Sequence, residues 1–352
     1  MKVVRIYPKT NFHTFLHSDT LWGNLIYAYR ILYGVDKTSE LLKEFSSNIP
    51  FKVSSIFPFE ILKNGNKKFS YYLPKPIMGS NIREIQNPEE MVYMKEFKKI
   101  RYVDKELFEK YLNGEIDDNL LFERFMTWQS ELNKDPSERN IDIINQNKFN
   151  YKTILNSTFN LHNSIDRMSG STLQAEDRGQ LYWEEEFVNY GNVLAETKDV
   201  VPGVYFLVDA KDISLIEAPL RLLSDIGMGG NRSIGKGSFD FEIKDFSFNQ
   251  PTKYNSYVSL SLFQPNQDDI NIISNDNIKL FYNIITRIGK VGKDFNLKFK
   301  EKNPVQCFTE GSTFFVNHYL NGDLVPTAVY NNNHKIFSNY LFFGVKANLR
   351  LQ

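Results

Sequence analysis

The spacing of apolar residues predicts a chain in which strands alternate with helices. Apolar side chains recur at helical spacing from Leu21 to Tyr33, so we expect a helix that begins near Ser18 and ends at Gly34. A second helix is expected from Ser214, where Glu217 completes the spacing of a capping box. Strand patterns occupy residues 2–7, 56–62, 69–73, 201–208 and 239–243.

The order of these elements favours a ferredoxin-like arrangement. An Asn-Gly pair at 64–65 predicts a hairpin turn between the second and third strands. The chain then reads strand, helix, strand, strand and, after an interruption, strand, helix, strand. This order approximates a sheet of four antiparallel strands with two helices on one face.

The interruption at residues 80–150 has a different character. It is rich in Glu, Lys and Asn, and it carries short helical patterns at 89–99, 104–112 and 119–132. We interpret it as an insertion between core strands rather than as a separate domain. The alternative is a solvated helical excursion.

The last hundred residues predict a second, shorter copy of the same unit. Strand patterns lie at 256–263, 312–317, 325–330 and 338–346, with a helical pattern at 277–288. The sequence therefore predicts an α+β fold of two tandem ferredoxin-like (RRM-like) domains. We place the first at 1–248, with a helical or thumb insertion at about 80–150, and the second at 249–352.

Composition narrows the possible functions. Lys and Arg number 42, as do Asp and Glu, so a protein that attracts polyanions through its overall charge is excluded and any nucleic-acid site must be a local patch. A single cysteine, Cys307, excludes an internal disulfide and zinc sites with two thiolates. The five histidines are scattered along the chain, and we expect no metal or cofactor. No apolar run is long enough for a membrane helix and no signal-peptide stretch opens the chain, so we expect a cytoplasmic protein without a membrane partner.

Residues 227–237 form the most informative stretch. They hold five glycines in eleven residues, and glycine lets main-chain N–H groups approach a phosphate without a Cβ in the way. Arg232 and Lys236 add positive charge beside those donors. The alternative is a glycine-rich turn that only reverses the chain.

The same stretch contains a false match to a nucleotide-binding loop. Residues 230–236 fit the start of a Walker A motif, but Gly237 stands where Ser or Thr should hold magnesium. The loop is also expected to run from a helix into a strand, whereas a P-loop runs from a strand into a helix. We therefore do not expect nucleotide hydrolysis here.

Two other polar clusters could join the loop. Arg167 and Arg178 could contact phosphate and Tyr182 could stack on a base, or they could be ordinary surface arginines and a core tyrosine. His17 and Ser18 stand at a helix start, where partial positive charge suits an anion, although such a start is more often only a capped helix.

These segments together resemble the RAMP superfamily of CRISPR proteins. The matching motifs are HSDTLWG at 17–23, NSIDR at 163–167, GQLY at 179–182, the loop at 227–237, TRIG at 286–289 and PVQCFTEGS at 304–312. The first of them makes the chain most similar to the fourth subunit of type III-A Csm interference complexes. The likeness spans most of the chain apart from 80–150 and the tail after 320. A departure lies at 339–344, where NYLFFG replaces an Arg-Tyr-Gly element.

The resemblance implies a non-catalytic RNA-binding subunit. Such a subunit caps the guide RNA (crRNA) at its 5′ repeat-derived tag, docks on the large polymerase/cyclase-like subunit and contacts the first backbone subunit. Its insertion acts as a thumb at the guide–target duplex, so target RNA is met only indirectly. The residues we expect to bind RNA are His17, Ser18, Arg167, Arg178, Gly229, Gly230, Asn231, Arg232, Ser233 and Lys236.

Two rival functions remain open. One is a RAMP-type endoribonuclease that processes guide precursors without metal, with His17 as general base and His13 nearby, since histidine has a suitable pKa for this work. The other is an assembly scaffold whose glycine-rich loop contacts protein rather than RNA.

Overall fold

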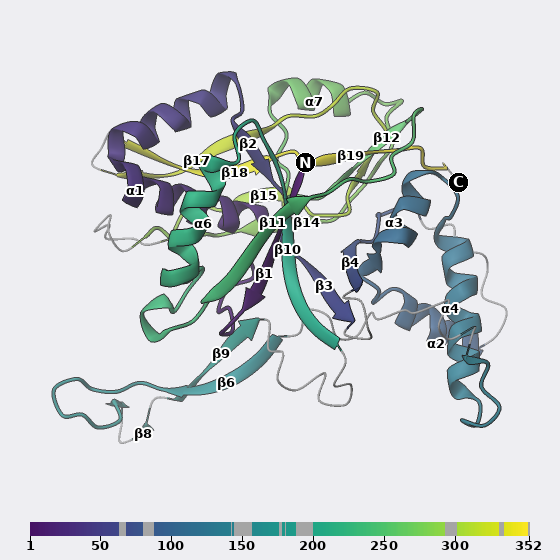
Figure 1. Ribbon diagram of the computed structural model, residues 1–352, viewed down its shortest axis with the longest axis horizontal. Coiled ribbons are helices and arrows are strands. Elements are labelled where there is room, and N and C mark those ends of the chain that lie inside the picture. Colours follow the sequence, from purple (N-terminus) through teal and green to yellow (C-terminus); the bar gives the residue numbers. More distant parts are fainter. Residues whose placement is uncertain are drawn as a thin grey trace.

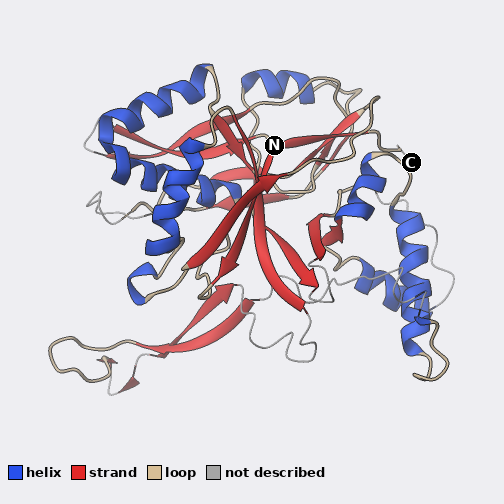
Figure 2. Cartoon of the chain, in the orientation of Figure 1, coloured by secondary structure: helices blue, strands red, loops and turns tan. Residues whose placement is uncertain are grey.

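The fold combines antiparallel sheets with helices (Figure 1). The computed structural model describes residues 1–62, 68–79, 88–141, 143, 157–175, 178–179, 181–187, 200–292, 301–330 and 334–350. Figure 2 shows most of the strands gathered at the centre, with helices around them and one pair of strands projecting at the lower left. No helix in these ranges has the length and apolar character that a membrane crossing needs.

The first and larger sheet is built from the first 245 residues. Its strands are β1 (Lys2–Pro8), β2 (Phe51–Val53), β3 (Phe57–Leu62), β4 (Lys68–Pro74), β5 (Tyr102–Asp104), β10 (Val200–Ala210) and β11 (Phe239–Asp245). They lie in the order β11-β1-β10-β3-β4-β5, with β2 also paired to β10, and every pairing is antiparallel. The predicted strands of this half are confirmed, while the turn expected at 64–65 lies outside the described residues.

Two helices, α1 (Ser18–Ser47) and α6 (Ser214–Ile226), cover one face of this sheet. Their apolar sides pack on alternate residues of the central strands, such as Val4 and Phe206, because successive strand residues point to opposite faces. The predicted start of α1 is confirmed. Its predicted end at Gly34 is wrong, since that glycine has a φ of 86° and only bends the helix, which resumes and continues to Ser47.

The predicted capping box of α6 is also wrong. Ser214 is the first helical residue rather than the cap. Its amide and hydroxyl both donate to the carboxylate of Asp212, at 2.9 and 2.7 Å. An Asx-type turn, in which the Asp212 side chain accepts from the Ser214 amide, therefore begins this helix. Aspartate and serine side chains both form such local hydrogen bonds to the main chain, so the sequence alone does not decide which of the two residues does so.

The insertion is a compact helical block at the far edge of the sheet. Helices α2 (Pro88–Phe97), α3 (Lys105–Leu112) and α4 (Asp118–Asn133) match the three predicted helical patterns. Their fully buried phenylalanines share one core with residues of β3 and β10, and β5 within the block pairs with β4. This shared core argues against a solvated helical excursion.

The second sheet comes from the last hundred residues. Its strands are β12 (Ser256–Ser259), β13 (Leu280–Phe281), β16 (Thr313–Phe314) and β19 (Gly344–Ala347), in the order β13-β16-β12-β19. Separate pairs are formed by β14 (Ile284–Arg287) with β15 (Val305–Phe308), and by β17 (Gly322–Tyr330) with β18 (His334–Leu341). Strands therefore occupy the four regions where sequence patterns place them.

The helix predicted at 277–288 is wrong. Residues 280–287 form β13 and β14 instead, and the helix of this half is α7 (Gln267–Ile273). The spacing of isoleucines suited a helix, but β-branched residues also favour strands, and pairing with β15 and β16 decides between the two. The signal for α7 was local, because Asn266 and Asp269 form a full capping box.

The two sheets share one strand order. Counting the four core strands of each half along the chain, both sheets read fourth, first, third, second: β11-β1-β10-β3 and β19-β12-β16-β13. A helix follows the first strand in each half, α1 and α7. In the second half the β17–β18 hairpin stands where the first half has α6, and its Leu324 and Phe337 pack against the core beneath α1.

A slender two-stranded arm projects from the body beside the segment that joins β1 to α1. Strands β6 (Ser157–Asn163) and β9 (Leu181–Phe187) form an antiparallel pair that extends to the lower left in Figure 1, beyond which β7 (Gln174–Ala175) pairs with β8 (Arg178–Gly179). At its root, Phe12 and Phe187 exchange two main-chain hydrogen bonds of 2.9 and 2.6 Å. The structure thus adds a projecting element outside the 80–150 block to which the thumb was assigned.

Candidate nucleic-acid interface

The glycine-rich loop connects α6 to β11, so it runs from a helix into a strand as the sequence predicts. Main-chain hydrogen bonds close its base: Met228 N–H donates to Gly237 O at 2.9 Å, and Gly237 N–H donates to Asn11 O at 3.0 Å. The base is therefore a defined turn rather than a free chain, and only the segment between those residues can face a ligand.

Two glycines of the loop are required by close packing. A Cβ at Gly237, where φ is 76°, would lie 2.1 Å from Met228 O, and a Cβ at Gly230 would lie 2.3 Å from Cδ2 of His13. The amides of Gly229 and Gly230 also point inward, toward Asn24 Oδ1 at 3.4 Å and Thr14 Oγ1 at 3.3 Å. Glycine here serves the fold, and these two amides are already engaged.

The outer end of the loop begins at Asn231. This residue has left-handed dihedrals (φ 58°, ψ 21°) and opens the short 3₁₀ turn η1 (Arg232–Ile234). Within the described residues, the amides of Asn231, Arg232 and Ser233 donate to no acceptor. Successive main-chain N–H groups that follow a left-handed residue form a concave donor cluster that suits an anion.

Two side chains flank those amides. Ser233 is exposed. The guanidinium carbon of Arg232 lies 4.8 Å from the ring centre of Tyr27, a cation–π distance that holds the side chain beside α1. Amides, a hydroxyl and a guanidinium together can bind phosphate oxygens.

Lys236, in contrast, is already paired. Its Nζ lies 2.7 Å from Oε1 of Glu186 on β9, whose other oxygen accepts a 2.9 Å hydrogen bond from Asn11 Nδ2. Burial alone would raise the pKa of Glu186, but the hydrogen bonds from Lys236 and Asn11 outweigh it and lower the pKa of the carboxyl. Glu186 is therefore an ionised, enclosed partner of the loop.

A second carboxylate of the arm, Glu184, also contacts the loop. Oε2 accepts a 2.9 Å hydrogen bond from Asn231 Nδ2. His13 and His162 approach the same carboxylate with Nε2 at 3.6 and 3.4 Å. Because Glu184 and Glu186 are two residues apart on a strand, both point to the face of the arm that lies on the loop.

The opposite face of the arm is apolar and exposed. Phe159, Leu161, Leu181 and Trp183 each expose half or more of their surface. The register pairs Leu161 with Trp183 and Asn163 with Leu181, so these side chains share one face of the two-stranded pair. Tyr182 points to the other face and stacks on His162, with ring centres 5.6 Å apart.

Arg167 and Arg178, which the sequence predicts to bind RNA, lie on the outer part of the arm. Arg167 is exposed in the turn at the tip of the arm, which the side chain and main chain of Asp166 hold together. Arg178 lies in β8 opposite Ala175, and its side chain is outside the described part of the structure. The fold does not bring either residue to the glycine-rich loop.

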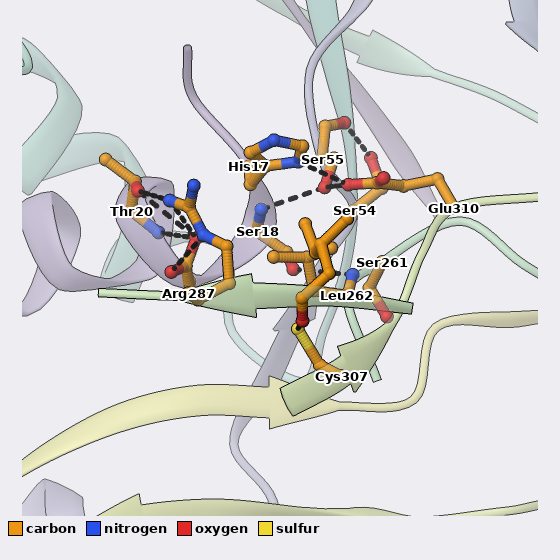
Figure 3. A network of polar contacts seen from close by, with 12 residues as sticks. His17, Ser18, Thr20, Ser54, Ser55, Ser261, Leu262, Arg287, Cys307 and Glu310 are labelled. Carbon is orange, nitrogen blue, oxygen red and sulfur yellow. Dashed lines mark hydrogen bonds and ion pairs between the residues drawn. The ribbon is translucent and has the colours of Figure 1, made fainter. Parts of the chain in front are cut away.

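His17 and Ser18 are placed at a contact between the two sheets (Figure 3). His17 Nδ1 lies 2.8 Å from Oε1 of Glu310, which also accepts a hydrogen bond from the Ser55 hydroxyl. Ser18 is fully buried: its N–H donates to Ser55 Oγ at 2.8 Å, and its hydroxyl accepts from Leu262 N–H at 3.0 Å. Ser18 thus connects α1 to the segment after β12, and direct contact with RNA would require this junction to open.

The next residue continues the junction. The buried carboxylate of Asp19 accepts from Arg287 Nε at 3.1 Å, and Nη2 of the same arginine reaches Thr20 Oγ1 at 3.1 Å. The HSDT motif therefore meets the TRIG and PVQCFTEGS motifs in space. Their joint occurrence in the sequence has a structural reason, the junction between the first and second sheets.

Sequence reasoning missed the acidic partners of the site. Glu184, Glu186 and Glu310 contact Asn231, Lys236 and His17, which the sequence predicts to bind RNA. The run Glu184-Glu185-Glu186 within a strand pattern was a usable signal, since alternate acids on one strand face need a basic or polar partner. The identity of that partner depends on tertiary packing.

Two family models match adjoining parts of the chain. One, described as the RAMP superfamily, matches residues 2–240, and the other, described as the CRISPR Csm4 C-terminal domain, matches residues 252–346. A CRISPR Csm4 protein of Methanocaldococcus jannaschii is 29% identical over 353 residues, covering 89% of this chain and 85% of that protein. A Csm4 protein of Thermococcus onnurineus is 25% identical over 268 residues, covering 74% of each.

Solved structures share the fold. One chain of a Csm3–Csm4 subcomplex from a type III-A interference complex superimposes with a TM-score of 0.58 at 21% identity, covering 99% of this chain and 100% of that chain. One chain of a Csm1–Csm4 cassette in complex with cA4 gives a TM-score of 0.57 at 18% identity, covering 99% and 98%. Since the superfamily model spans well over half of the sequence and the Csm4 model follows it directly, the chain belongs to the RAMP superfamily, as a Csm4-type subunit of type III CRISPR systems.

Proposed function

We propose that this chain binds the 5′ repeat-derived tag of the guide RNA and does not cut it. The observation that carries the proposal is the outer end of the glycine-rich loop, where three main-chain N–H groups stand beside Arg232 and Ser233. Donors fixed by the backbone select a phosphate chain by shape and charge. A neutral protein can bind RNA in this way because only a local surface needs to be basic.

A structural role for His17 supports the non-catalytic part of the proposal. The imidazole is hydrogen-bonded through Nδ1 to an almost enclosed carboxylate, and it lies at the junction between the sheets. This contact accounts for the histidine without a catalytic step. Labelled guide precursor incubated with the full chain in the absence of metal should stay intact; cleavage that disappears in His17→Ala would instead establish the endoribonuclease alternative.

We also infer that the chain links the large subunit to the backbone of the complex. Support comes from relatives that were solved as a Csm1–Csm4 cassette and as a Csm3–Csm4 subcomplex. A single Csm4-type chain that pairs with both subunits can join them. Target RNA would then be met only through the guide, at the arm or at the helical block.

The division of the chain into two ferredoxin-like domains, 1–248 and 249–352, is part of the same proposal. The shared strand order of the two sheets supports it, as does the boundary between the two family models near residue 250. In the second domain the β17–β18 hairpin takes the place of the second helix.

Tag recognition is tested with RNAs that differ only in where the tag lies. The full chain is titrated with labelled guide RNA that carries the tag at its 5′ end, with the same RNA carrying the tag at its 3′ end, and with a scrambled tag. We expect the first RNA to bind at least tenfold more tightly, since base reading on a single strand adds to the phosphate contacts. Equal affinity for all three RNAs would contradict tag binding.

A further inference from the structure

The ion pair between Lys236 and Glu186 joins two parts of the molecule that the sequence separates by fifty residues. Lys236 comes from the glycine-rich loop, and Glu186 comes from the root of the arm. The carboxylate also holds Asn11, from the segment between β1 and α1. One side chain therefore ties together the arm, the loop and the N-terminal segment.

The burial of this pair is strongly asymmetric. The side chain of Glu186 is 2% exposed and that of Lys236 is 26% exposed. A buried carboxylate that loses its cation is left uncompensated, which is much more costly than losing an exposed pair. A variant that lacks the lysine should therefore move Glu186, and the arm with it, rather than simply remove a charge from the surface.

Contacts on either side of the Lys236–Glu186 pair also hold the arm in place. Glu184 on the same strand accepts from Asn231, and Phe187 exchanges main-chain hydrogen bonds with Phe12. These contacts flank Glu186 on both sides along β9. The direction in which the arm leaves the body and the shape of the loop are thus set by the same few residues.

We propose that Lys236 is a positioning residue rather than a phosphate ligand: acting through Glu186, it fixes the arm against the glycine-rich loop so that RNA meets both at a constant spacing. The inference rests on the proposed function, because it assigns a role within the RNA-binding surface. It revises the expectation that Lys236 contacts RNA directly. Arg232 and the amides of Asn231 to Ser233 remain as the groups of the loop that face phosphate.

A charge exchange separates the two roles. In the double variant Lys236→Glu with Glu186→Lys the pair is kept and reversed, and Asn11 and Asn160, which both donate to Glu186, can turn their amides so that the oxygens face the new lysine. Lys236→Glu alone should weaken binding of the 5′-tagged guide RNA about tenfold or more, and the exchange should restore most of that loss. A lysine that held a phosphate would give the opposite result, because the glutamate would still repel the RNA in the double variant.

A milder variant keeps the proposal testable if the exchange does not fold. Glu186→Gln removes the charge but keeps one oxygen that can accept from Lys236, and its new amide N–H groups can donate to Asn11 once that side chain turns its oxygen toward them. For a positioning lysine we expect unchanged or weaker RNA binding and an unchanged slope of affinity against salt concentration. For a phosphate ligand, freeing the lysine would tighten binding and steepen the slope, which would overturn the proposal.

Arg232→Ala, measured in parallel, separates failure of this inference from failure of the proposed function. A lower salt slope for Arg232→Ala together with restored binding in the exchange variant supports both. A lower slope for both Arg232→Ala and Lys236→Gln would reject the positioning role while keeping RNA binding at the loop. No change for any loop variant would reject RNA binding at the loop itself.

Discussion

Arg232 is the residue on which the proposed RNA contact depends most directly. Its guanidinium rests on Tyr27 and, within the described residues, pairs with no carboxylate. Arg232→Ala should weaken guide-RNA binding roughly tenfold and lower the salt slope by about 0.7, the amount for one phosphate contact on a single strand. Filter binding across a salt series measures both quantities.

A matched arginine serves as the control for this prediction. Arg221 lies on α6, is well exposed and pairs with Glu217 four residues earlier. Arg221→Ala should leave the affinity and the slope unchanged. Equal losses for the two variants would mean that the loop contributes only general positive charge.

Gly237 makes a second prediction at this scale, about folding rather than binding. Its positive φ and the 2.1 Å approach to Met228 O leave no room for a side chain. Gly237→Ala should lower the free energy of unfolding by about 2–4 kcal/mol. Gly23→Ala is the control, since Gly23 lies in the second turn of α1, a Cβ there meets nothing within 4 Å, and alanine favours a helix. Denaturant unfolding of the two variants distinguishes a required glycine from a tolerated one.

At the scale of elements, the junction between α1 and the second sheet should respond to acid. Burial would raise the pKa of Glu310, but the neighbouring charge and hydrogen bond of His17 and the hydroxyl of Ser55 lower it overall. A carboxyl whose pKa is lower in the folded state stabilises the fold above the unfolded pKa, near 4.3 for glutamate, and this stabilisation is lost as the pH falls through the folded value.

Glu310→Gln should therefore lower the free energy of unfolding at pH 7 by about 1–3 kcal/mol and flatten its decline below pH 4. Glu138→Gln, an exposed acid after α4, is the matched control and should change neither. Thermal unfolding between pH 3 and pH 7 gives both quantities. An unaltered acid limb in Glu310→Gln would show that the contact with His17 does not stabilise the junction.

The elements also show what the sequence could predict. Alternation and helical spacing located five of the seven strands of the first sheet, its two helices and the three helices of the insertion, because each has a clear apolar face; the three-residue strands β2 and β5 are too short to show a pattern. The error at 277–288 arose where the chain forms short strands, and the partner of β13 lies more than thirty residues away, so that pairing rather than local pattern decides the structure.

The site was predictable to a similar extent. The glycine-rich loop and its turn could be located from composition, because left-handed dihedrals and close packing require glycine. The assignment of Lys236 and Ser18 as ligands depended on exposure, which only tertiary packing fixes. The acid on β9 that pairs with Lys236 and the amide of Leu262 that donates to Ser18 come from distant segments.

For the whole molecule, RNA binding and partner binding should occupy different faces. In Figure 1 the arm and the glycine-rich loop lie at the lower left, whereas the helical block lies at the right and the second sheet at the top. The double variant Arg167→Ala with Arg232→Ala should lose guide-RNA binding and still elute with Csm1 on gel filtration. Loss of Csm1 binding in the same variant would instead favour a scaffold whose loop contacts protein.

The central claim concerns where the end of the guide RNA lies, and crosslinking measures this directly. Guide RNA with photoreactive nucleotides in its 5′ tag is bound to the full chain, irradiated, and the attached peptides are mapped by mass spectrometry. The account predicts crosslinks within residues 229–236 and on the adjoining root of the arm. Crosslinks confined to helices α2 to α4, or to the β17–β18 hairpin, would contradict it.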